Sequence, residues 1–329
     1  MQRRTLSSGV ALTELGFGAA QLGNLYRATS DEEAREAIIR ARELGISYFD
    51  TAPHYGLGLS EQRLGSMLQE VPRDDVVVST KVGRLLEPSP DRQGELDEHF
   101  VVPATHRRVW DFSREGILRS LEASLDRLGL DRIDIVYLHD CDDHWDQAST
   151  HAATTLTELR EQGVIRAWGA GLNQAPMTAE FIRRCDVDVM MIAGRFSLVD
   201  STALTEVLPL AGERGVGIVA AAVFNSGLLS SPVVAADARF DYAEAPQELL
   251  ERARRIADVC SSFGVSLPDA ALAYPLRHSA VVSVVVGMRT AAQVDSNAER
   301  LATDIPSDLW LELESAGLIA AINPQETQP

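Results

Sequence analysis

Four side chains that can exchange or hold protons lie at or just after the ends of short apolar runs. One run ends in an aspartate, with a tyrosine five residues later. A second run is followed by a lysine, and a third ends in a histidine. In parallel β–α units, the carboxyl ends of the strands meet at one face, even when they are far apart in the sequence. The sequence therefore predicts one site built from Asp50, Tyr55, Lys81 and His139.

These residue types complement one another in proton transfer. A tyrosine with a pKa of about 10 is a poor acid or base near neutral pH. A buried ammonium about 4 Å away contributes roughly 4 kcal/mol at an effective dielectric near 20, enough to lower that pKa by up to ~3 units. Buried Lys81 would lose its charge unless an anion such as Asp50 held it. We therefore predict that Tyr55 transfers the proton and that His139 orients the substrate oxygen or shares the proton.

Each of these residues also has a purely structural explanation. Asp50 could cap a loop, Tyr55 could be an ordinary loop aromatic, and His139 could be a hydrogen-bonded residue at a strand end. A lysine that ends a buried strand is unusual as packing. Because four such explanations would have to hold together, the catalytic interpretation is favoured.

The elements that position these residues follow from the periodicity of the chain. Short apolar runs alternate with longer segments of helical period, which predicts repeated β–α units and a parallel sheet. A doubly wound sheet is the alternative, but Gly16–Gly23 has its third glycine at the wrong spacing for a dinucleotide-binding turn. We therefore predict an α/β fold, a single (β/α)8 TIM barrel over residues 1–329. The eight predicted strands are Leu15–Phe17, Ile46–Asp50, Val76–Thr80, Ile133–His139, Ile165–Ala170, Val187–Ile192, Gly217–Ala221 and Val281–Val286.

Three further features complete the expected architecture. Residues 1–14 contain two short β-forming runs around Ser7-Ser8-Gly9, which predicts an N-terminal β-hairpin at the closed end of the barrel. The connection over residues 84–112 is long enough to form a lid or binding loop over the active-site face. The predicted helices include Asp31–Leu44, Ser60–Gln69, Ser113–Leu128, Ala148–Gln162, Thr202–Arg214 and Pro246–Phe263.

Composition restricts the partners. The 30 basic and 48 acidic residues give a net charge of −18, which disfavours nucleic acid and anionic membranes. No apolar run reaches the roughly 18–20 residues that cross a bilayer, and Met1–Thr5 is not followed by a signal-peptide pattern. Cys141, Cys185 and Cys260 show no metal-ligand spacing and no disulfide pattern. We expect a cytoplasmic protein that uses no metal; the oligomeric state is open.

The segment Phe49–Gly56 (FDTAPHYG) resembles the signature of the aldo-keto reductase superfamily. Thr80-Lys81 and Leu138–Asp140 are similar to two other active-site segments of that superfamily, and the resemblance runs from about residue 5 to residue 302. It implies an NAD(P)-dependent (β/α)8 enzyme in which Asp50, Tyr55, Lys81 and His139 form the catalytic tetrad. Hydride would pass between the nicotinamide and a carbonyl or carbinol carbon, while Tyr55 gives or takes the proton.

The resemblance also implies cofactor contacts. Asn173 would hold the nicotinamide carboxamide, and Phe224–Leu229 would form the pyrophosphate loop. The segment after the last barrel strand would bind the adenosine phosphate, and a helix N-terminus with an arginine is itself a reasonable anion site. As plain alternatives, Asn173 is a turn residue and Arg289 a surface arginine. The implied cofactor residues are Asn173, Phe224, Asn225, Gly227, Leu228, Gly287, Met288, Arg289, Gln293 and Asn297.

Three positions depart from the family pattern. Leu172 replaces a common serine, Ala193 or a neighbour replaces a glutamine, and Ser296 replaces a glutamate. Recognition of the nicotinamide and adenine therefore differs in detail. The lone Arg289 could serve a 2′-phosphate or stack on adenine, so NAD and NADP are both open, with a preference for NAD.

Several segments resemble a smaller branch of the superfamily, which contains D-threo-aldose 1-dehydrogenases (L-fucose dehydrogenases), L-galactose dehydrogenases and a pyridoxal 4-dehydrogenase. Phe17–Ala20, Ala193–Leu198 and Val223–Gly227 are among them. The resemblance implies oxidation of a cyclic hemiacetal, of a sugar or a pyridoxal-like substrate, to a lactone with Tyr55 as base. A polyol needs several buried hydrogen-bond partners, for which the candidates are His54, Trp110, Asp140, Asp142 and Asn225.

Two alternatives to this function stay open. One is a reductase of unrelated aldehydes or ketones on the same fold. The other is a cofactor-binding regulatory subunit, similar to the potassium-channel beta subunits that share the fold. A pure binding role does not need an Asp50–Lys81 pair, which favours an enzyme.

Overall fold

Eight parallel strands close into a barrel in the computed structural model, which describes residues 1–241 and 243–322. Every predicted strand overlaps one of them, so the predicted (β/α)8 barrel is confirmed and the doubly wound sheet is excluded. Around the barrel, the strands are β3 (Leu15–Gly18), β4 (Tyr48–Asp50), β5 (Val77–Val82), β8 (Ile135–His139), β9 (Ala167–Leu172), β10 (Val189–Ala193), β11 (Gly217–Ala221) and β14 (Val281–Gly287).

The predicted N-terminal hairpin is present and closes one end of the barrel. β1 (Arg3–Thr5) pairs antiparallel with β2 (Ala11–Thr13). Leu6, Val10 and Leu12 join the apolar cluster inside the barrel, and a Cβ on Gly217 would overlap the Leu6 side chain. The hairpin therefore fills the end at which the strands begin, which leaves the other end for the site.

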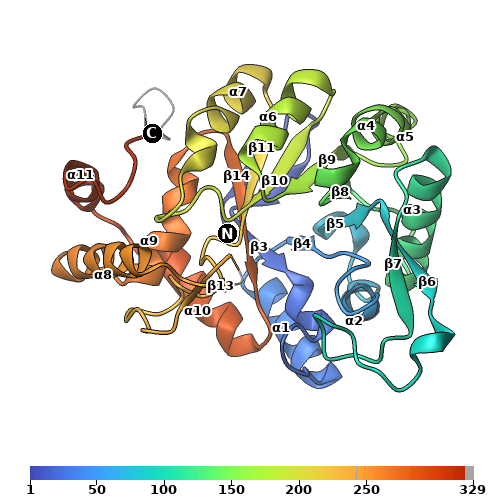
Figure 1. Ribbon diagram of the computed structural model, residues 1–329, viewed down its shortest axis with the longest axis horizontal. Coiled ribbons are helices and arrows are strands. Elements are labelled where there is room, and N and C mark those ends of the chain that lie inside the picture. The colour runs from blue at the N-terminus through green and yellow to red at the C-terminus, as the bar shows by residue number, and fades with distance from the viewer. Residues whose placement is uncertain (242, 323–329) are drawn as a thin grey trace.

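Helices surround the strands, as Figure 1 shows. The first begins at a capping box, in which Ser30 and Glu33 bond each other's backbone N–H groups. The predicted helix over 148–162 begins with a π-helical turn, Ala148–Ala152, which joins a short α-helical segment before it to the α-helix that follows. The helices are α1 (Asp31–Glu43), α2 (Leu59–Leu68), α3 (Arg114–Leu128), α4 (Trp145–Gln147), α5 (Ala153–Glu161), α6 (Ala175–Arg184), α7 (Val207–Arg214), α8 (Gln247–Ser262), α9 (Leu267–Ala273), α10 (Ala291–Ala302) and α11 (Ser307–Ser315).

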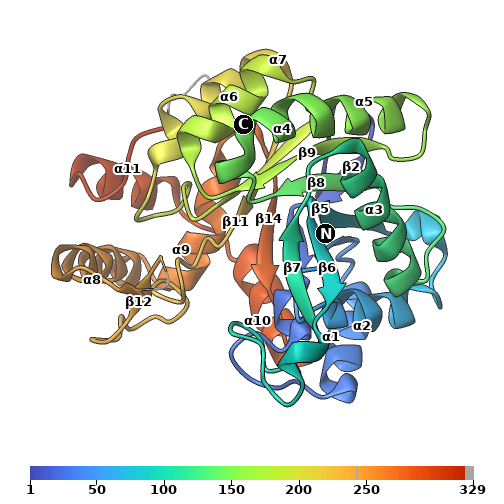
Figure 2. The same cartoon turned by 45° about the vertical axis from the view of Figure 1, so that its right-hand side comes forward.

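The long connection at 84–112 contains a second hairpin, which the periodicity did not predict. β6 (Arg84–Pro88) pairs antiparallel with β7 (His106–Trp110), and Figure 2 shows this pair beside α3. Gly83 makes the sharp turn into β6 with φ of +90°, and a Cβ there would overlap the Phe112 ring. The segment is thus an ordered element that starts directly at the end of β5.

Within the described residues, no single helix is both long and apolar enough to cross a membrane. The segments Gln247–Ser262 and Leu267–Arg277 meet the requirement only as a pair, which is bent by 97°. The same part of the chain contains no group of three or more His, Cys, Asp or Glu side chains that could hold a metal ion.

Candidate active site

The four predicted proton-handling residues converge at the open end of the barrel. Asp50 ends β4, Lys81 lies near the end of β5, and His139 ends β8. These three strands are consecutive in the barrel. Tyr55 follows β4 in a turn, and the Lys81 Nζ lies 4.8 Å from the centroid of its ring. The strand order therefore brings together side chains that are almost 90 residues apart in the sequence.

Asp50 and Lys81 form a buried ion pair. Lys81 Nζ donates to Asp50 Oδ2 at 2.6 Å and to the carbonyl oxygen of Thr51 at 2.9 Å, and both charged side chains are about 96–97% shielded from solvent. Burial alone would favour the neutral amine. Asp50 and the Tyr55 hydroxyl outweigh that effect, so the pKa of Lys81 is raised and the ammonium persists. The predicted pairing of this lysine with Asp50 is present in the structure.

The expectation for Tyr55 itself needs correction. Burial raises the pKa of Tyr55, the Lys81 ammonium lowers it, and the nearby Asp50 carboxylate raises it again. The net direction is upward, because the loss of water around the phenolate and the charge of Asp50 exceed the attraction of one ammonium. The lysine thus limits the rise in the Tyr55 pKa and does not bring the pKa below its ordinary value.

Two glycines let the Tyr55 turn approach the first strand–helix connection. A Cβ on Gly23 would lie 2.5 Å from the backbone carbon of Tyr55, and one on Gly56 would overlap Gly23 in return. The Ser60 hydroxyl, at the start of α2, also donates to the carbonyl oxygen of Ala19. Backbone packs directly on backbone here, which holds the position of the tyrosine.

His139 is neutral and incompletely bonded. Burial, followed by the charge of Lys81, keeps its pKa well below the ordinary histidine value. Its Nε2 lies 3.6 Å from Asp140 Oδ2, while its buried Nδ1 has no partner in the part of the chain that the structure describes. A neutral imidazole has one donor and one acceptor nitrogen. His139 can therefore still bond an oxygen-bearing ligand.

His54, predicted as a substrate contact, lies next to His139 with ring centroids 5.6 Å apart. Its Nδ1 accepts a hydrogen bond from Nε of Arg108, which places the proton of the neutral ring on Nε2. Burial, then the charges of Arg84 and Arg108, lower the pKa of His54 to about 2. Arg108 is itself held by both carboxylate oxygens of Asp97, at 2.6 and 3.0 Å. His54 is thus fixed as a neutral donor.

A chain of hydroxyl groups inside the barrel leads to Asp50. Ser79 Oγ donates to Asp50 Oδ1 at 2.7 Å, the Tyr48 hydroxyl lies 3.1 Å from Ser79 Oγ, and the Tyr137 hydroxyl lies 3.2 Å from that of Tyr48. Because the Ser79 proton goes to Asp50, Tyr48 must donate to Ser79 and Tyr137 to Tyr48. Every donor points toward the carboxylate.

These three residues were not predicted from the sequence, although a signal was present. Each stands two positions before a site residue on its own strand: Tyr48 before Asp50, Ser79 before Lys81, and Tyr137 before His139. Side chains two apart on a strand face the same side. Polar residues at that spacing inside apolar strands therefore indicate a network within the barrel.

The remaining predicted substrate residues also lie at this end of the barrel. Asp140 follows His139 with φ of +41°, and its Oδ2 is 3.3 Å from Nη2 of Arg84. Asp142 has a buried Oδ1 with no partner among the described residues. Trp110, at the end of β7, stacks with Phe112 and approaches His144. Arg84 and Arg108 were not predicted, because only the β6–β7 pairing brings them over the barrel.

The loop after β11 has the features of a ligand cradle. Asn225, Ser226 and Gly227 have successive positive φ angles of 43°, 56° and 95°, which turn the chain sharply. Asn225 is buried; its Nδ2 donates to the carbonyl oxygen of Gly194, and its Oδ1 has no partner in the described chain. Phe224 lies under the Arg300 guanidinium, at 5.8 Å. A buried unpaired acceptor beside an open glycine turn fits a polar ligand such as a dinucleotide.

The segment after β14 fits such a ligand only in part. Gly287 is exposed beside the Gln21 side chain, whose Oε1 is buried and lacks a partner in the described residues. Met288 is fully buried, and Asn297 is buried with its Oδ1 accepting from Arg300. Gln293 accepts from the backbone N–H of Arg289. The open backbone at Gly287 and the Gln21 acceptor are the parts that fit.

Arg289 differs from the expectation of a free anion-binding side chain. It is 6% exposed, and its guanidinium donates to the carbonyl oxygens of Leu25 and Arg27 and to the Thr29 hydroxyl. These bonds tie the connection after β3 to the end of β14. The physical reason is that acceptors of a loop some 260 residues earlier hold the guanidinium through both of its terminal nitrogens.

Asn173 is exposed at the end of β9, and its carbonyl oxygen accepts a 2.7 Å bond from Nε of Arg195. The same arginine pairs with Asp200 at 2.8 Å and with Asp241 at 2.6 Å. Arg195 therefore links the loops that follow β9, β10 and β11. This position leaves the Asn173 side chain at the rim of the barrel.

Comparison with known proteins agrees with this geometry. Residues 14–317 match the profile of the Aldo/keto reductase family. The chain is 49% identical to a D-threo-aldose 1-dehydrogenase of a Pseudomonas species over 317 residues, which cover 95% of this chain and 96% of the relative. It is 38% identical to the pyridoxal 4-dehydrogenase of Microbacterium luteolum, covering 97% of this chain and 98% of that protein.

A solved structure is similar over nearly the whole chain. The aldo-keto reductase AKR11C1 from Bacillus halodurans, in its holo form, superposes with a TM-score of 0.76 at 28% identity and covers 99% of both chains. The similarity therefore extends over almost the whole of both chains.

Proposed function

The chain belongs to the aldo/keto reductase family and is an oxidoreductase, and on that premise we propose that it oxidises the anomeric carbon of an aldopyranose to a lactone with an NAD(P) cofactor. The observation that carries the proposal is the buried Asp50–Lys81 pair placed under the Tyr55 ring. Similarity to a D-threo-aldose 1-dehydrogenase at 49% identity supports the substrate class.

Tyr55 is the general base of this reaction. A bound nicotinamide cofactor would supply the acceptor for the hydride of the anomeric carbon. The Tyr55 oxygen accepts the proton of the anomeric hydroxyl, and the Lys81 ammonium stabilises the phenolate that receives it. Asp50 keeps Lys81 protonated throughout. In the reverse direction, Tyr55 returns the proton to a carbonyl oxygen.

His139 and His54 orient the reacting oxygen. Both are neutral, so each offers a hydrogen bond without a charge that would compete with Lys81. His139 has an unpaired buried nitrogen for this purpose. Trp110, Asp140 and Asp142, together with Asn225, would contact the remainder of the sugar.

We propose that the cofactor lies across the ends of β9, β11 and β14. Asn173 would hold the carboxamide, the loop with Phe224, Asn225, Gly227 and Leu228 the pyrophosphate, and Gly287, Met288, Gln293 and Asn297 the adenosine end. Arg289 would act by fixing the Leu25–Thr29 connection, since it donates three hydrogen bonds there. Arg289 already donates three hydrogen bonds to the Leu25–Thr29 connection, which supports NAD over NADP.

A related candidate is oxidation of the hemiacetal of pyridoxal, supported by 38% identity to a pyridoxal 4-dehydrogenase. The hemiacetal is common to both substrates, so the same base would serve. Reduction of simple aldehydes is the other alternative on this fold. A purely regulatory role is disfavoured, because a binding module has no use for a buried ion pair beneath a tyrosine.

The experiment is a spectrophotometric assay at the reduced-nicotinamide band. A panel of aldoses that includes L-fucose, together with pyridoxal, is supplied with NAD and NADP separately. We expect at least one aldose to be oxidised with NAD. Its kcat/KM should be the highest in the panel. Activity on pyridoxal alone would replace the aldose proposal, and reduction of small aldehydes without any aldose oxidation would reject it.

A further inference from the structure

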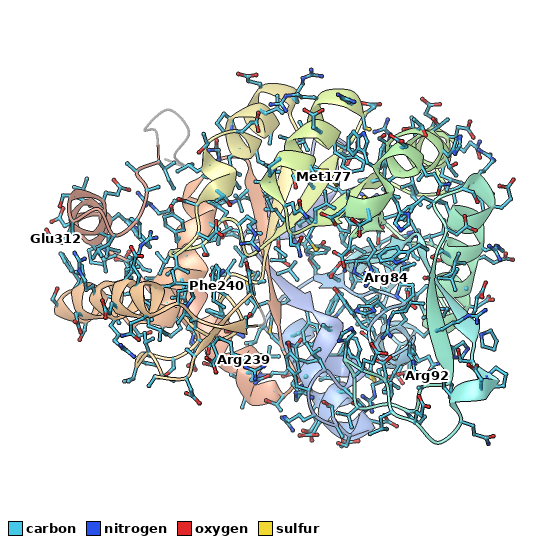
Figure 3. All side chains as sticks on the ribbon, in the orientation of Figure 1. Arg84, Arg92, Met177, Arg239, Phe240 and Glu312 are labelled. Carbon is cyan, nitrogen blue, oxygen red and sulfur yellow. The ribbon has the colours of Figure 1, made fainter. Side chains whose placement is uncertain are left out.

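Arg84 occupies a central place at the open end of the barrel. It comes three residues after Lys81, directly after the Gly83 turn, and begins β6. Figure 3 shows Arg84 between the hairpin and the barrel. In the β6–β7 register it stands opposite Trp110, and Leu86 stands opposite Arg108. The face of the hairpin that carries these side chains is therefore the one turned to the site.

The guanidinium of Arg84 is fixed on one side. Its Cζ lies 4.1 Å from the centroid of the Trp110 ring, which in turn stacks on Phe112 with centroids 5.9 Å apart. Such stacking favours Arg over Lys, because the planar cation covers the ring. The Arg84 side chain is 14% exposed. It is thus held in place before any ligand binds.

The hydrogen-bond donors of Arg84 are largely unused. Within the part of the chain that the structure describes, its one ionic partner is Asp140, with Nη2 and Oδ2 3.3 Å apart, and no shorter side-chain bond is donated by Arg84. A guanidinium carries five N–H groups. A largely buried guanidinium that has one ionic partner in the described chain is suited to a ligand.

The guanidinium of Arg84 lies among the residues of the reacting centre. Burial and then the charge of Lys81 lower the pKa of His139, and the charge of Arg84 adds to this effect. The charge of Arg84 also lowers the pKa of His54, after burial. Oδ2 of Asp140 lies 3.3 Å from Nη2 of Arg84 and 3.6 Å from Nε2 of His139, so the two side chains meet at the same carboxylate oxygen. Arg84 therefore lies beside His139 at the reacting centre.

The charges around Arg84 indicate the class of ligand. Asp140 is its ion partner and Asp142 is a second carboxylate close enough to affect its pKa, which burial lowers and Asp140 raises. Arg108, the other nearby cation, is neutralised by Asp97. One cation beside two carboxylates repels a phosphate or carboxylate group. A hydroxyl both donates and accepts, so adjacent hydroxyls fit a guanidinium that lies next to a carboxylate.

We propose that Arg84 and Asp140 form a diol-binding fork that recognises adjacent hydroxyl groups of a neutral polyhydroxy substrate. This inference rests on the proposed function in one respect, which is that the polyhydroxy substrate is a sugar. Arg84 donates to one hydroxyl oxygen, Asp140 accepts from the neighbouring hydroxyl, and Trp110 holds the guanidinium in the binding position. The β6–β7 hairpin is thus an element of substrate recognition as well as a cover.

The test compares two aldehydes of three carbons, glyceraldehyde and propanal, which differ only in two hydroxyl groups. Reduction by NADH or NADPH is measured with the wild type, Arg84→Gln and Arg84→Lys. Arg107→Gln is the matched control, because Arg107 is the exposed neighbour of Arg108 on β7 and pairs only with Glu87 in the described chain. Binding of NAD(P)H by fluorescence and the melting temperature report on cofactor binding and folding.

We expect Arg84→Gln to lower kcat/KM for glyceraldehyde about 10- to 100-fold, as the loss of hydrogen bonds to a charged group does, with less than about 3-fold change for propanal. Arg84→Lys retains the charge, so its kcat/KM for glyceraldehyde should lie between those of the wild type and Arg84→Gln. Arg107→Gln should leave both values unchanged. The wild type should also prefer glyceraldehyde to its 3-phosphate.

Other results would overturn the proposal. Equal losses for both aldehydes would mean that Arg84 supports chemistry or folding, and no loss for either would mean that it contacts no substrate. A wild type that does not prefer glyceraldehyde to propanal, or that prefers the phosphate, would also contradict it. Glyceraldehyde cannot close into a pyranose, and its reduction is measured, so this outcome is independent of the oxidation of aldopyranoses, whose failure would reject only the proposed function.

Discussion

The Ser79 hydroxyl donates a 2.7 Å hydrogen bond to Oδ1 of Asp50, whose other oxygen lies 2.6 Å from the Lys81 ammonium. The carboxylate is therefore shared between a neutral donor on one side and a cation on the other. Tyr48 and Tyr137 extend the neutral side into the barrel. The electrostatic effect of Asp50 on Lys81 and Tyr55 therefore depends on the hydrogen bonds to both of its carboxylate oxygens.

Removal of the Ser79 hydroxyl should shift the pH dependence of oxidation. In Ser79→Ala, Asp50 loses the hydrogen bond that partly offsets its negative charge. The carboxylate then repels the Tyr55 phenolate more strongly. We expect the rising limb of kcat against pH to move upward by roughly 0.5–1 unit, equivalent to ~0.7–1.4 kcal/mol. Tyr137→Phe, at the far end of the chain, is the control and should move the limb less. An unchanged limb in Ser79→Ala would show that the hydroxyl chain is only structural.

Loss of the Tyr55 hydroxyl should abolish most turnover without weakening cofactor binding. Tyr55→Phe removes the proton acceptor but keeps the ring that packs near Phe100 and His139. Positioned acid–base groups contribute about 10²- to 10⁴-fold, so kcat should fall by that factor. Steady-state assays and titration of NAD(P)H fluorescence measure the two properties separately. Near-normal turnover in this variant would remove Tyr55 from the proposed mechanism.

Breaking the buried ion pair should destabilise the fold. Asp50→Asn leaves the Lys81 ammonium buried without its carboxylate, and loss of one partner of a buried pair costs about 3–5 kcal/mol. Lys81→Met should cost a similar amount, while the double variant should be more stable than the sum of the two effects predicts. Urea unfolding followed by circular dichroism gives the three values. Strictly additive losses would mean that the two charges do not interact.

Acid should destabilise the protein through its buried histidines. An unfolded histidine gains a proton below pH of about 6.5, whereas folded His139 and His54 stay neutral because their pKa values are lowered, that of His54 to about 2. The unfolded state then binds more protons, so the free energy of unfolding falls by about 1.4 kcal/mol per pH unit for each histidine.

This pH dependence can be checked by unfolding between pH 7 and pH 5. His54→Gln cannot be protonated and should remove one histidine's share of the slope, while His151→Gln, on the exposed side of a helix, should not. The same slope in His54→Gln as in the wild type would contradict the assignment of a neutral, buried imidazole.

Removal of the Arg289 side chain should loosen one connection. Arg289→Gln loses the bonds to the carbonyl oxygens of Leu25 and Arg27, and buried acceptors left unpaired cost about 1–3 kcal/mol each. We expect faster amide hydrogen exchange over residues 25–29, with exchange in β5 unchanged. Arg300→Gln is the control, because Arg300 lies in α10, the helix that follows Arg289 in the chain. Unaltered exchange over 25–29 would indicate that Arg289 does not hold this connection.

The prediction of the barrel rested on local patterns. Each strand is a short apolar run that is buried on both faces, and such runs can be recognised from a few consecutive residues. The convergence of Asp50, Lys81 and His139 followed from their positions at strand ends. The β6–β7 hairpin was not predicted, because its strands are only partly buried and lack a continuous apolar run. Ser79 and Tyr48 were missed because their role depends on a neighbouring strand.

The sequence by itself determined the order of the β–α units and which side chains stand at the strand ends, since periodicity and strand position are properties of the local chain. Only the tertiary structure decided what each arginine contacts. Arg289 donates to two carbonyl oxygens and a hydroxyl some 260 residues away, while Arg84 rests on Trp110 and has Asp140 as its one ionic partner in the described chain. Hydrogen bonds act over about 3 Å, so the use of each donor is settled by distant segments that folding brings within that range.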